Sequence, residues 1–268
     1  MGIAYCSEDV ISRSAWAAID SRGFSDCELN GRMLRCMPGV GTARSDVELL
    51  CASDMDSIGF SSLCLLSQHK SSAGKTSFTV HAAGNWGDDT RLGGSPRSLS
   101  RSDPVLMHSV LASMKRNAAG VNCTYEATHH GPLLQTPSFF AEFGGSDLDI
   151  KNEGMGALLG KCVLDGMLDV MEGRHAWDRI AIGIGSQHYP DKFTDIAMRR
   201  GVAFAHIMPG YAITADDDYA CLDMLERAAA MSSIGVELAF IEWKGINSEA
   251  RNRVVAKLGQ MGLDYERA

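Results

Sequence analysis

Residues 179–185 read Arg-Ile-Ala-Ile-Gly-Ile-Gly, a run that is apolar on both faces. Such a run is typical of a strand in a sheet that helices cover on both sides. From about residue 60 onward, further short apolar runs alternate with segments of helical apolar spacing. This alternation predicts an α/β fold, a three-layer α/β/α sandwich with a mostly parallel or mixed sheet. The other predicted strands cover residues 62–69, 77–82, 122–130, 139–144, 202–208 and 236–243.

Four helices are predicted from caps and from apolar spacing. Asp103, which precedes a proline, marks the start of the first helix. The second covers residues 153–172, where Gly156 and Gly160 predict close packing against a neighbour. We expect one domain over residues 1–268, because both sides of the long loop 88–103 are needed to build one sheet. The remaining helices are predicted to begin at a capping box of Thr214 and Asp217 and near Asn247.

Composition and charge narrow the class of protein. The chain has 45% hydrophobic and 22% charged residues, which is ordinary for a globular protein. It contains no apolar run of the ~18 residues that a membrane span needs, and no signal peptide pattern at its start. We therefore expect a cytoplasmic protein with no membrane partner. The net charge of −8 argues against a DNA-binding protein and would require any tRNA to meet a local basic patch.

The eight cysteines form no C-x-x-C pair, and several lie inside apolar patterns. Buried reduced thiols in a reducing compartment are therefore expected. Five of the eight histidines, in contrast, lie at or just past the ends of predicted strands. Ligands of open α/β sheets bind outside the carboxyl ends of the strands, so these imidazoles are expected to face one rim. They are His69, His81, His129, His130 and His188.

Two of these strand ends carry further polar residues. After His81, a turn bounded by Gly84 presents Asn85, either as a capping residue or as an oxyanion donor beside a base. In the block from Glu126 to Pro132, strand alternation predicts that Glu126 and His130 share one face and that His129 lies on the other. Both histidines then reach one site only if the chain turns between them.

A third strand end follows the glycines of residues 183–185. Gly185 lets the backbone approach a ligand closely, and Tyr189 offers a stacking surface or a hydroxyl donor beside His188. His206 has apolar neighbours, so a core histidine and a site residue remain equally open. Histidine and glutamate together support general acid–base hydrolysis or a Zn²⁺ ion with three protein ligands. Spacing alone does not separate these two chemistries.

These motifs together resemble the archaeal and plant type of D-aminoacyl-tRNA deacylase. The matching positions come in the family's order over residues 65–215, and the block from Glu126 to Pro132 is the most specific of them. Three departures from the family pattern are the interruption of its glycine run by Ser186 and Gln187, the Pro190-Asp191 pair after Tyr189 where Ala-Pro is usual, and Phe143-Gly144-Gly145 where Ile-Gly-Ser is usual. The other matching residues are Ser67 to Ser71, Thr79 to His81, Gly84 and Asn85, Glu142, Gly144, residues 183–185, His188 and Tyr189, Phe193 and Thr194, His206 and Tyr211.

The resemblance implies a hydrolase that cleaves the ester between a D-amino acid and the tRNA 3′ end, a form of translation quality control. It also implies a fold akin to those of nucleoside phosphorylases and peptidyl-tRNA hydrolases, a Zn²⁺ cofactor, aminoacylated tRNA as the partner and a monomeric state. The implied catalytic residues are His81, Glu126, His129, His130 and His188. The implied substrate-binding residues are His69, Lys70, Gly84, Asn85, Gly185, Tyr189 and His206. The candidate zinc ligands are His81, Glu126, His130 and His188.

Alternative functions remain open at this point. One is a zinc-dependent amidohydrolase or esterase acting on a small metabolite, and another is a nucleotide-binding module without hydrolysis. For the deacylase, backbone N–H groups near Gly84 or Gly185 are expected to stabilise the oxyanion. Candidate contacts to tRNA phosphates are Lys70, Lys75, Arg91, Arg97, Arg101 and Lys192.

Overall fold

A computed structural model describes residues 1–45, 52–70, 75–213 and 218–268. By its internal contacts the chain forms two compact units. Unit 1 comprises residues 1–80, 109–124 and 134–175, and unit 2 comprises residues 81–108, 125–133 and 176–268. Thr214 and Asp217, the predicted capping box, lie outside the described residues.

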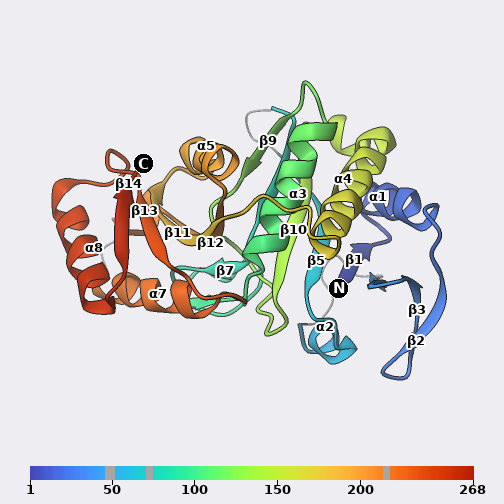
Figure 1. Cartoon of the computed structure of the whole chain (residues 1–268), viewed down its shortest axis with the longest axis horizontal. Helices are drawn as coiled ribbons and strands as arrows, with labels where there is room; N and C mark the ends of the chain where they lie inside the picture. Colours follow the sequence, from blue (N-terminus) through green and yellow to red (C-terminus); the bar gives the residue numbers. More distant parts are fainter. Residues whose placement is uncertain (46–51, 71–74, 214–217) are drawn as a thin grey trace. The chain divides into compact units, whose positions relative to one another are not determined.

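Unit 1 is built on an eight-stranded mixed sheet (Figure 1). Its strand order is β2-β3-β4-β1-β5-β10-β6-β9, with β1 parallel to β4 and β5 and with β5 parallel to β10. The strands are β1 (Gly2–Cys6), β2 (Ser25–Leu29), β3 (Arg32–Met37), β4 (Val40–Ser45), β5 (Leu63–Lys70), β6 (Ser77–His81), β9 (Asn122–Tyr125) and β10 (Ser138–Gly145).

Helices α1 (Val10–Asp20) and α4 (Glu153–Met171) pack together in unit 1. A Cβ atom on Gly156 or Gly160 would overlap the α1 residues Ile11 or Ala15, which confirms the predicted close packing. The remaining helical elements on this part of the chain are α2 (Ala52–Ile58), α3 (Pro104–Asn117) and the short 3₁₀ helix η1 (Asp149–Lys151).

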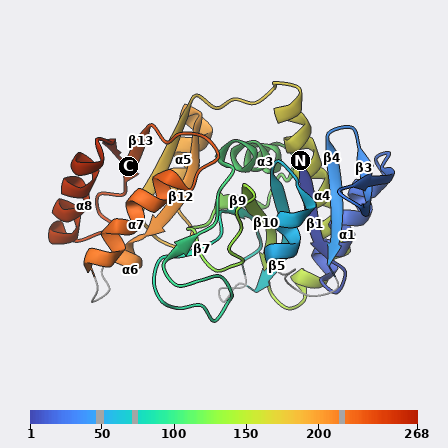
Figure 2. The same ribbon diagram turned by 90° about the horizontal axis from the view of Figure 1, so that it is seen from below.

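Unit 2 contains a four-stranded parallel sheet in the order β12-β11-β13-β14. Figure 1 shows helix α5 on one side of this sheet and α7 on the other, and Figure 2 shows the same elements from below. A two-stranded ribbon, β7 (Gly84–Asn85) with β8 (Ser98–Leu99), borders the long loop. The other elements are β11 (Arg179–Ser186), α5 (Asp191–Arg200), β12 (Val202–Pro209), α6 (Gly210–Ile213), α7 (Asp218–Ala230), β13 (Leu238–Ile241), α8 (Ser248–Met261) and β14 (Asp264–Arg267).

The predicted α/β class with a mixed or mostly parallel sheet is confirmed. One predicted strand is wrong in extent, because residues 122–130 form a strand only as far as Tyr125. The antiparallel strands β2 and β3 and the helix α5 were not predicted. Among the described residues, no helix is long and apolar enough to cross a membrane.

The cysteines follow the prediction in part. Cys6, Cys64, Cys123 and Cys162 are buried free thiols, as expected. Cys27 is joined to Cys36 in a disulfide, so the prediction of reduced thiols is wrong for this pair. The two residues lie on β2 and β3, whose antiparallel pairing brings their Cα atoms to 5.8 Å, within the range that a disulfide spans. Cys51 lies outside the described residues.

Candidate active site

The segment after β9 leaves the sheet and hydrogen-bonds to other elements of unit 2. The N–H of Ala127 donates to the carbonyl of His188 at 2.8 Å, and the N–H of Thr128 donates to the carbonyl of Ile207 at 2.9 Å. Because this segment is not a sheet strand, the predicted alternation of Glu126 and His130 against His129 does not apply. The correction has a local cause as well, since His130 has a positive φ of 43° and turns the chain there.

This turn brings three imidazoles together in what we call the histidine cluster, His81, His129 and His130. The ring of His129 lies 4.2 Å from that of His81 and 4.3 Å from that of His130, and the rings of His81 and His130 are 5.0 Å apart. His81 ends β6, as predicted, and is 1% exposed. Both members of the His129–His130 pair therefore reach one site.

The backbone fixes the same tautomer in all three rings of the histidine cluster. In each ring, Nδ1 lies within hydrogen-bonding distance of a carbonyl oxygen, which only accepts, so Nδ1 carries the proton. In the neutral ring, the lone pair is then on Nε2. The three bonds run from His81 to the oxygen of Ala82 at 3.1 Å, from His129 to that of Ala127 at 2.8 Å and from His130 to that of Gly131 at 2.6 Å.

Glu126 places a buried carboxylate beside the histidine cluster. Its side chain is 2% exposed, and its Oε2 lies 3.1 Å from Nε2 of His188 and 3.5 Å from Nε2 of His129. At 3.1 Å, the carboxylate can accept a hydrogen bond from Nε2–H of His188. His129 thus links the histidine cluster to the pair formed by Glu126 and His188, whose ring lies 4.6 Å from that of His129.

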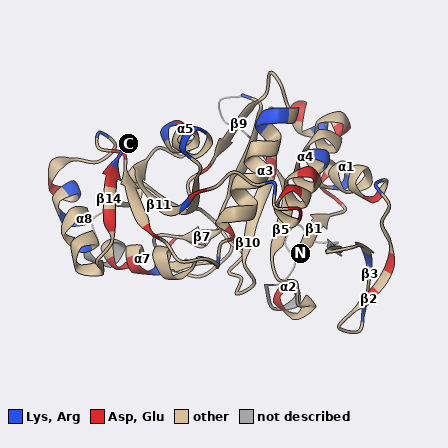
Figure 3. Cartoon of the chain, in the orientation of Figure 1, with Lys and Arg blue, Asp and Glu red and all other residues tan. Residues whose placement is uncertain are grey.

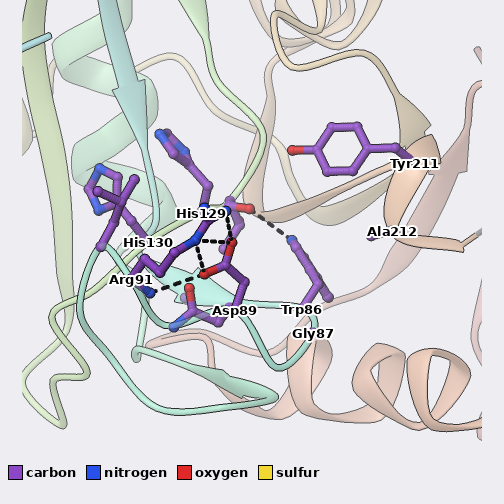
Figure 4. A pocket seen from close by; sticks show the side chains of 12 residues that line it. Trp86, Gly87, Asp89, Arg91, His129, His130, Tyr211 and Ala212 are labelled. Atoms are coloured by element: carbon purple, nitrogen blue, oxygen red, sulfur yellow. Dashed lines mark hydrogen bonds and ion pairs between the residues drawn. The ribbon is translucent and has the colours of Figure 1, made fainter. Parts of the chain in front are cut away.

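A pocket of about 630 Å³ opens beside the histidine cluster (Figure 4). Trp86 and Tyr211 supply its aromatic side chains, and the Trp86 Nε1–H donates to the carbonyl of Thr128 at 2.8 Å. The lining residues are Gly84, Asn85, Trp86, Gly87, Asp89, Arg91, Leu92, Thr128, His129, His130, Tyr211 and Ala212.

Comparison with known proteins identifies the family of this chain. A sequence profile of the family described as D-aminoacyl-tRNA deacylase matches residues 57–266, most of the chain. The chain belongs to the D-aminoacyl-tRNA deacylase family.

Archaeal relatives named D-aminoacyl-tRNA deacylase agree with this assignment. The protein of Pyrococcus furiosus is 33% identical over 201 residues, which cover 74% of this chain and 70% of that protein. The protein of Methanocaldococcus jannaschii is 30% identical over 234 residues, 83% of this chain and 88% of that protein. For the Methanosarcina barkeri protein, at 33% identity, the match covers 74% of this chain and 62% of the relative's length.

A solved structure shares the fold. It is described as a conserved protein of unknown function, and it superposes with a TM-score of 0.84 over 100% of this chain and 95% of its own, at 23% identity. At this identity the likeness concerns the fold alone. The predicted likeness to phosphorylase and peptidyl-tRNA hydrolase folds stays a prediction.

The deacylase family implies zinc, and the side chains in the site suit that ion. Imidazole nitrogen and carboxylate oxygen are the usual ligands of catalytic zinc. A zinc-binding histidine usually donates its other N–H to a carbonyl or carboxylate, which is the arrangement of all three rings in the histidine cluster. The predicted ligands His81, Glu126, His130 and His188 fall into two groups, and His129 completes each. Among the described residues of unit 2, these groups are His81, His129 and His130, and Glu126, His129 and His188.

The loop around residues 87–97, which lines one side of the pocket, is held by several hydrogen bonds. The Asn85 amide donates to the carbonyls of Gly93 at 2.9 Å and Ser95 at 3.3 Å, so its N–H bonds serve the loop. The N–H of Gly131 donates to the carbonyl of Leu92 at 3.1 Å. A Cβ atom on Gly131 would overlap the backbone of the loop, so this approach requires glycine. The pocket wall is therefore preformed.

One predicted oxyanion donor is corrected by these contacts. The N–H of Gly84 donates to the carbonyl of His130 at 2.7 Å and also lies 3.3 Å from that of His129. It lines the pocket but holds the histidine segment in place instead of pointing at a substrate. Gly185 has a positive φ of 88° and packs close to Ile246, and it is not among the residues that line the pocket.

His206 contacts the pocket-lining residue Thr128 from the protein interior. It is 1% exposed, its Nδ1 lies 3.2 Å from the Thr128 hydroxyl, and its Nε2–H donates to the carbonyl of Met231 at 3.1 Å. Burial lowers the pKa of His206 to about 4, so the ring is neutral at pH 7. The Thr128 backbone in turn holds Trp86, so His206 lies one layer behind the pocket wall.

The other predicted substrate-binding residues lie in different places. Tyr189 is 36% exposed, with its ring 5.0 Å from that of His188. His69 and Lys70 belong to unit 1, where Nδ1 of His69 lies 2.9 Å from Oε2 of Glu142. Trp86 and Tyr211 were not predicted to line a pocket, although Tyr211 is itself one of the residues that match the family and Trp86 directly follows the matched Gly84 and Asn85.

The predicted phosphate contacts mostly have acidic partners. Figure 3 marks acidic and basic residues along the ribbon, and both kinds occur in each unit. Exposed pairs of this kind contribute little to stability, so an incoming phosphate can displace the carboxylate. The pairs are Arg91 with Asp89 at 2.6 Å, Arg97 with Asp88 at 2.9 Å, Lys70 with Asp147 at 2.6 Å and Lys192 with Glu242 at 3.2 Å.

Proposed function

We propose that this chain hydrolyses the ester between a D-amino acid and the 3′ end of tRNA and releases the free amino acid and tRNA. The observation that carries the proposal is the histidine cluster, two of whose rings, His129 and His130, line a preformed pocket in a chain of this family. The substrate is a charged tRNA used in translation, so the expected compartment is the cytoplasm.

The first step requires a base for water. An Nε2 atom of the histidine cluster accepts a proton from a water molecule, and the resulting hydroxide attacks the ester carbonyl carbon. The hydrogen bond from Nδ1–H to a backbone carbonyl keeps Nε2 pointed at the site and stabilises the imidazolium that forms. General base catalysis of this kind contributes about 10²–10⁴-fold.

The second step requires an acid for the leaving group. The C–O bond to the ribose breaks, and the departing ribose oxygen takes a proton. Nε2 of His188 lies 3.1 Å from Oε2 of the buried Glu126, so the carboxylate can accept a hydrogen bond from this ring and orient it. We assign His188 as this acid and Glu126 as the residue that positions it.

Zinc, when bound, lowers the pKa of a coordinated water molecule to near neutrality. We propose that His81, His129 and His130 would hold it through the same Nε2 atoms, in which case the bound ion supplies the activated water and no ring of the histidine cluster acts as the base. The Nδ1–H bonds of these residues orient Nε2 in the way that metal-binding histidines require. His129 belongs to the proposed ligand set and also lies next to Glu126. Substitution of His129 is therefore expected to reduce both the zinc content and the turnover.

The test is to incubate the protein with matched D- and L-aminoacyl-tRNAs and to follow ester loss, with and without a chelator. The expected result is hydrolysis of the D-ester alone. Equal rates on both esters, or none on either, would overturn the proposed function. Retained D-specific turnover after verified metal removal would overturn the zinc assignment only.

A further inference from the structure

The pocket beside the histidine cluster is much larger than the ester that the proposed function places there. Its volume of about 630 Å³ falls in the range of sites for whole small ligands, about 300–1,000 Å³. The histidine cluster occupies one end through His129 and His130, and aromatic side chains occupy other parts (Figure 4). The pocket therefore has room for a group attached to the reacting ester.

Two groups flank that ester, the amino-acid side chain on one side and the ribose with its base on the other. The solvent exposure of the residues at the pocket's border indicates which of these two groups the pocket holds. Tyr211 is 60% exposed, Leu92 is 69% exposed and the Arg91 side chain is 88% exposed. A polynucleotide must continue into solvent from its terminal nucleoside, whereas a side chain ends within its subsite. An open border therefore favours the nucleoside.

The aromatic side chains favour a planar occupant. Tyr211 extends from the short helix α6, and in Figure 4 it lies across open space from Trp86. Trp86 is 7% exposed and is fixed by its bond to the carbonyl of Thr128 and by the edge-on ring of His206 at 6.4 Å. Trp86 thus forms a rigid wall, and Tyr211 forms an accessible face. Bases stack on such faces irrespective of sequence.

The charges at the border fit an adenosine with its 5′ phosphate. Arg91 is bound to Asp89 through Nε and Nη2, so the pair is neutral as a whole. Because both side chains are exposed, a phosphate can take the guanidinium from Asp89 at small cost. A neutral border with one displaceable cation suits a single nucleotide at the end of a chain.

We infer that this pocket is the subsite for the 3′-terminal adenosine of the tRNA, whose adenine stacks on Tyr211 opposite the Trp86 wall. The inference rests on the proposed function, which supplies a substrate that ends in this nucleoside. It assigns to Tyr211 a binding role in which the base is recognised independently of the amino acid.

The test measures binding of adenosine 5′-monophosphate to the full chain by calorimetry, and KM for two D-aminoacyl-tRNAs whose side chains differ in size. In Tyr211→Ala, the dissociation constant for the nucleotide and both KM values are expected to rise about 10-fold, the effect of losing one stack. The preference for D- over L-esters is expected to stay. Tyr211→Phe keeps the ring and is expected to bind as the unaltered protein does.

Tyr265→Ala is the matched control, because Tyr265 is a partly exposed tyrosine of β14 outside the pocket lining. It is expected to leave nucleotide binding unchanged. If Tyr211→Ala changes the ratio between large and small D-amino acids and leaves nucleotide affinity intact, the pocket holds the side chain and the inference is wrong. No change in either quantity would also overturn it. Nucleotide binding remains measurable even if no ester is hydrolysed, so the two proposals fail separately.

Discussion

The histidine cluster beside Glu126 in unit 2 and the His69–Glu142 pair in unit 1 both place imidazole next to carboxylate, but their Nδ1 atoms have different hydrogen-bond partners. In unit 2, each ring of the histidine cluster donates its Nδ1–H to a backbone carbonyl. In unit 1, Nδ1 of His69 is bound to Glu142, and a Cβ atom on Gly144 would overlap the His69 ring. In the first group the bonds orient the rings from the backbone, and in the second a bond joins two side chains of the neighbouring strands β5 and β10.

The largest expected difference between the two groups is in turnover. His129→Asn removes the ring shared by both sets of candidate ligands, and we expect kcat/KM for a D-aminoacyl-tRNA to fall about 10³-fold with little loss of stability. His69→Asn leaves Glu142, which is 2% exposed, without its ring partner, and we expect a loss of about 1–3 kcal/mol in the free energy of unfolding.

Steady-state kinetics and urea unfolding of both variants check this contrast. We expect kcat/KM to fall less in His69→Asn than in His129→Asn. Equal falls in kcat/KM would show that the two groups do not differ in the way their bonds indicate.

A second difference concerns the loss of folding stability at low pH. The folded pKa of His206, about 4, lies below its ordinary value of 6.5 because the ring is buried. Between pH 6.5 and 4 the unfolded chain binds the extra proton, so unit 2 loses up to about 3 kcal/mol of stability as the pH falls through this window. His206→Gln removes this proton site. Unfolding measured at pH 7 and at pH 4.5 is expected to show a smaller acid loss in the variant, and an unchanged loss would contradict the assignment.

A third difference in pH dependence has the opposite sign and lies in unit 1. Burial raises the pKa of Asp9, the N-cap residue of α1, from 3.8 to about 6, with the charge of Glu142 as a further cause. Between pH 4 and 6 the folded chain holds the extra proton, so stability falls as the pH rises, by up to about 3 kcal/mol. Bonds from the neighbouring backbone N–H groups reduce this effect.

Asp9→Asn retains a good helix cap without the charge. Its unfolding free energy, measured relative to the unaltered protein, is expected to increase from pH 4 to pH 6. A difference that stays constant over this range would show that Asp9 titrates normally.

The fold was largely predictable, because its strands and helices are marked by local patterns. The apolar run in residues 179–185 and the cap at Asn247 both lie where the structure has β11 and the start of α8. The hairpin of β2 and β3 was not predicted, since its residues are half exposed and carry little apolar alternation. Its disulfide depends on pairing between strands, which spacing alone does not reveal.

The candidate site was predictable only in its residue types. His81 lies at a strand end, and a strand end is visible as the limit of an apolar run. The grouping of His129 with His130 depends on the positive φ of His130 and on bonds from Ala127 and Thr128 to distant parts of the chain. Such bonds leave no local signature. The same reason explains why the predicted strand 122–130 continued past Tyr125.

The hydrogen bonds donated by Ala127 and Thr128 also determine how the histidine cluster is lost when unit 2 unfolds. Ala127 is tied to the turn after β11 and Thr128 to β12, so the segment cannot detach from one without straining the other. Their amide protons are therefore expected to exchange with solvent only when unit 2 unfolds as a whole. The histidine cluster then disappears in one cooperative event, and slow exchange at these two amides becomes a direct measure of how much of the protein is competent at any moment.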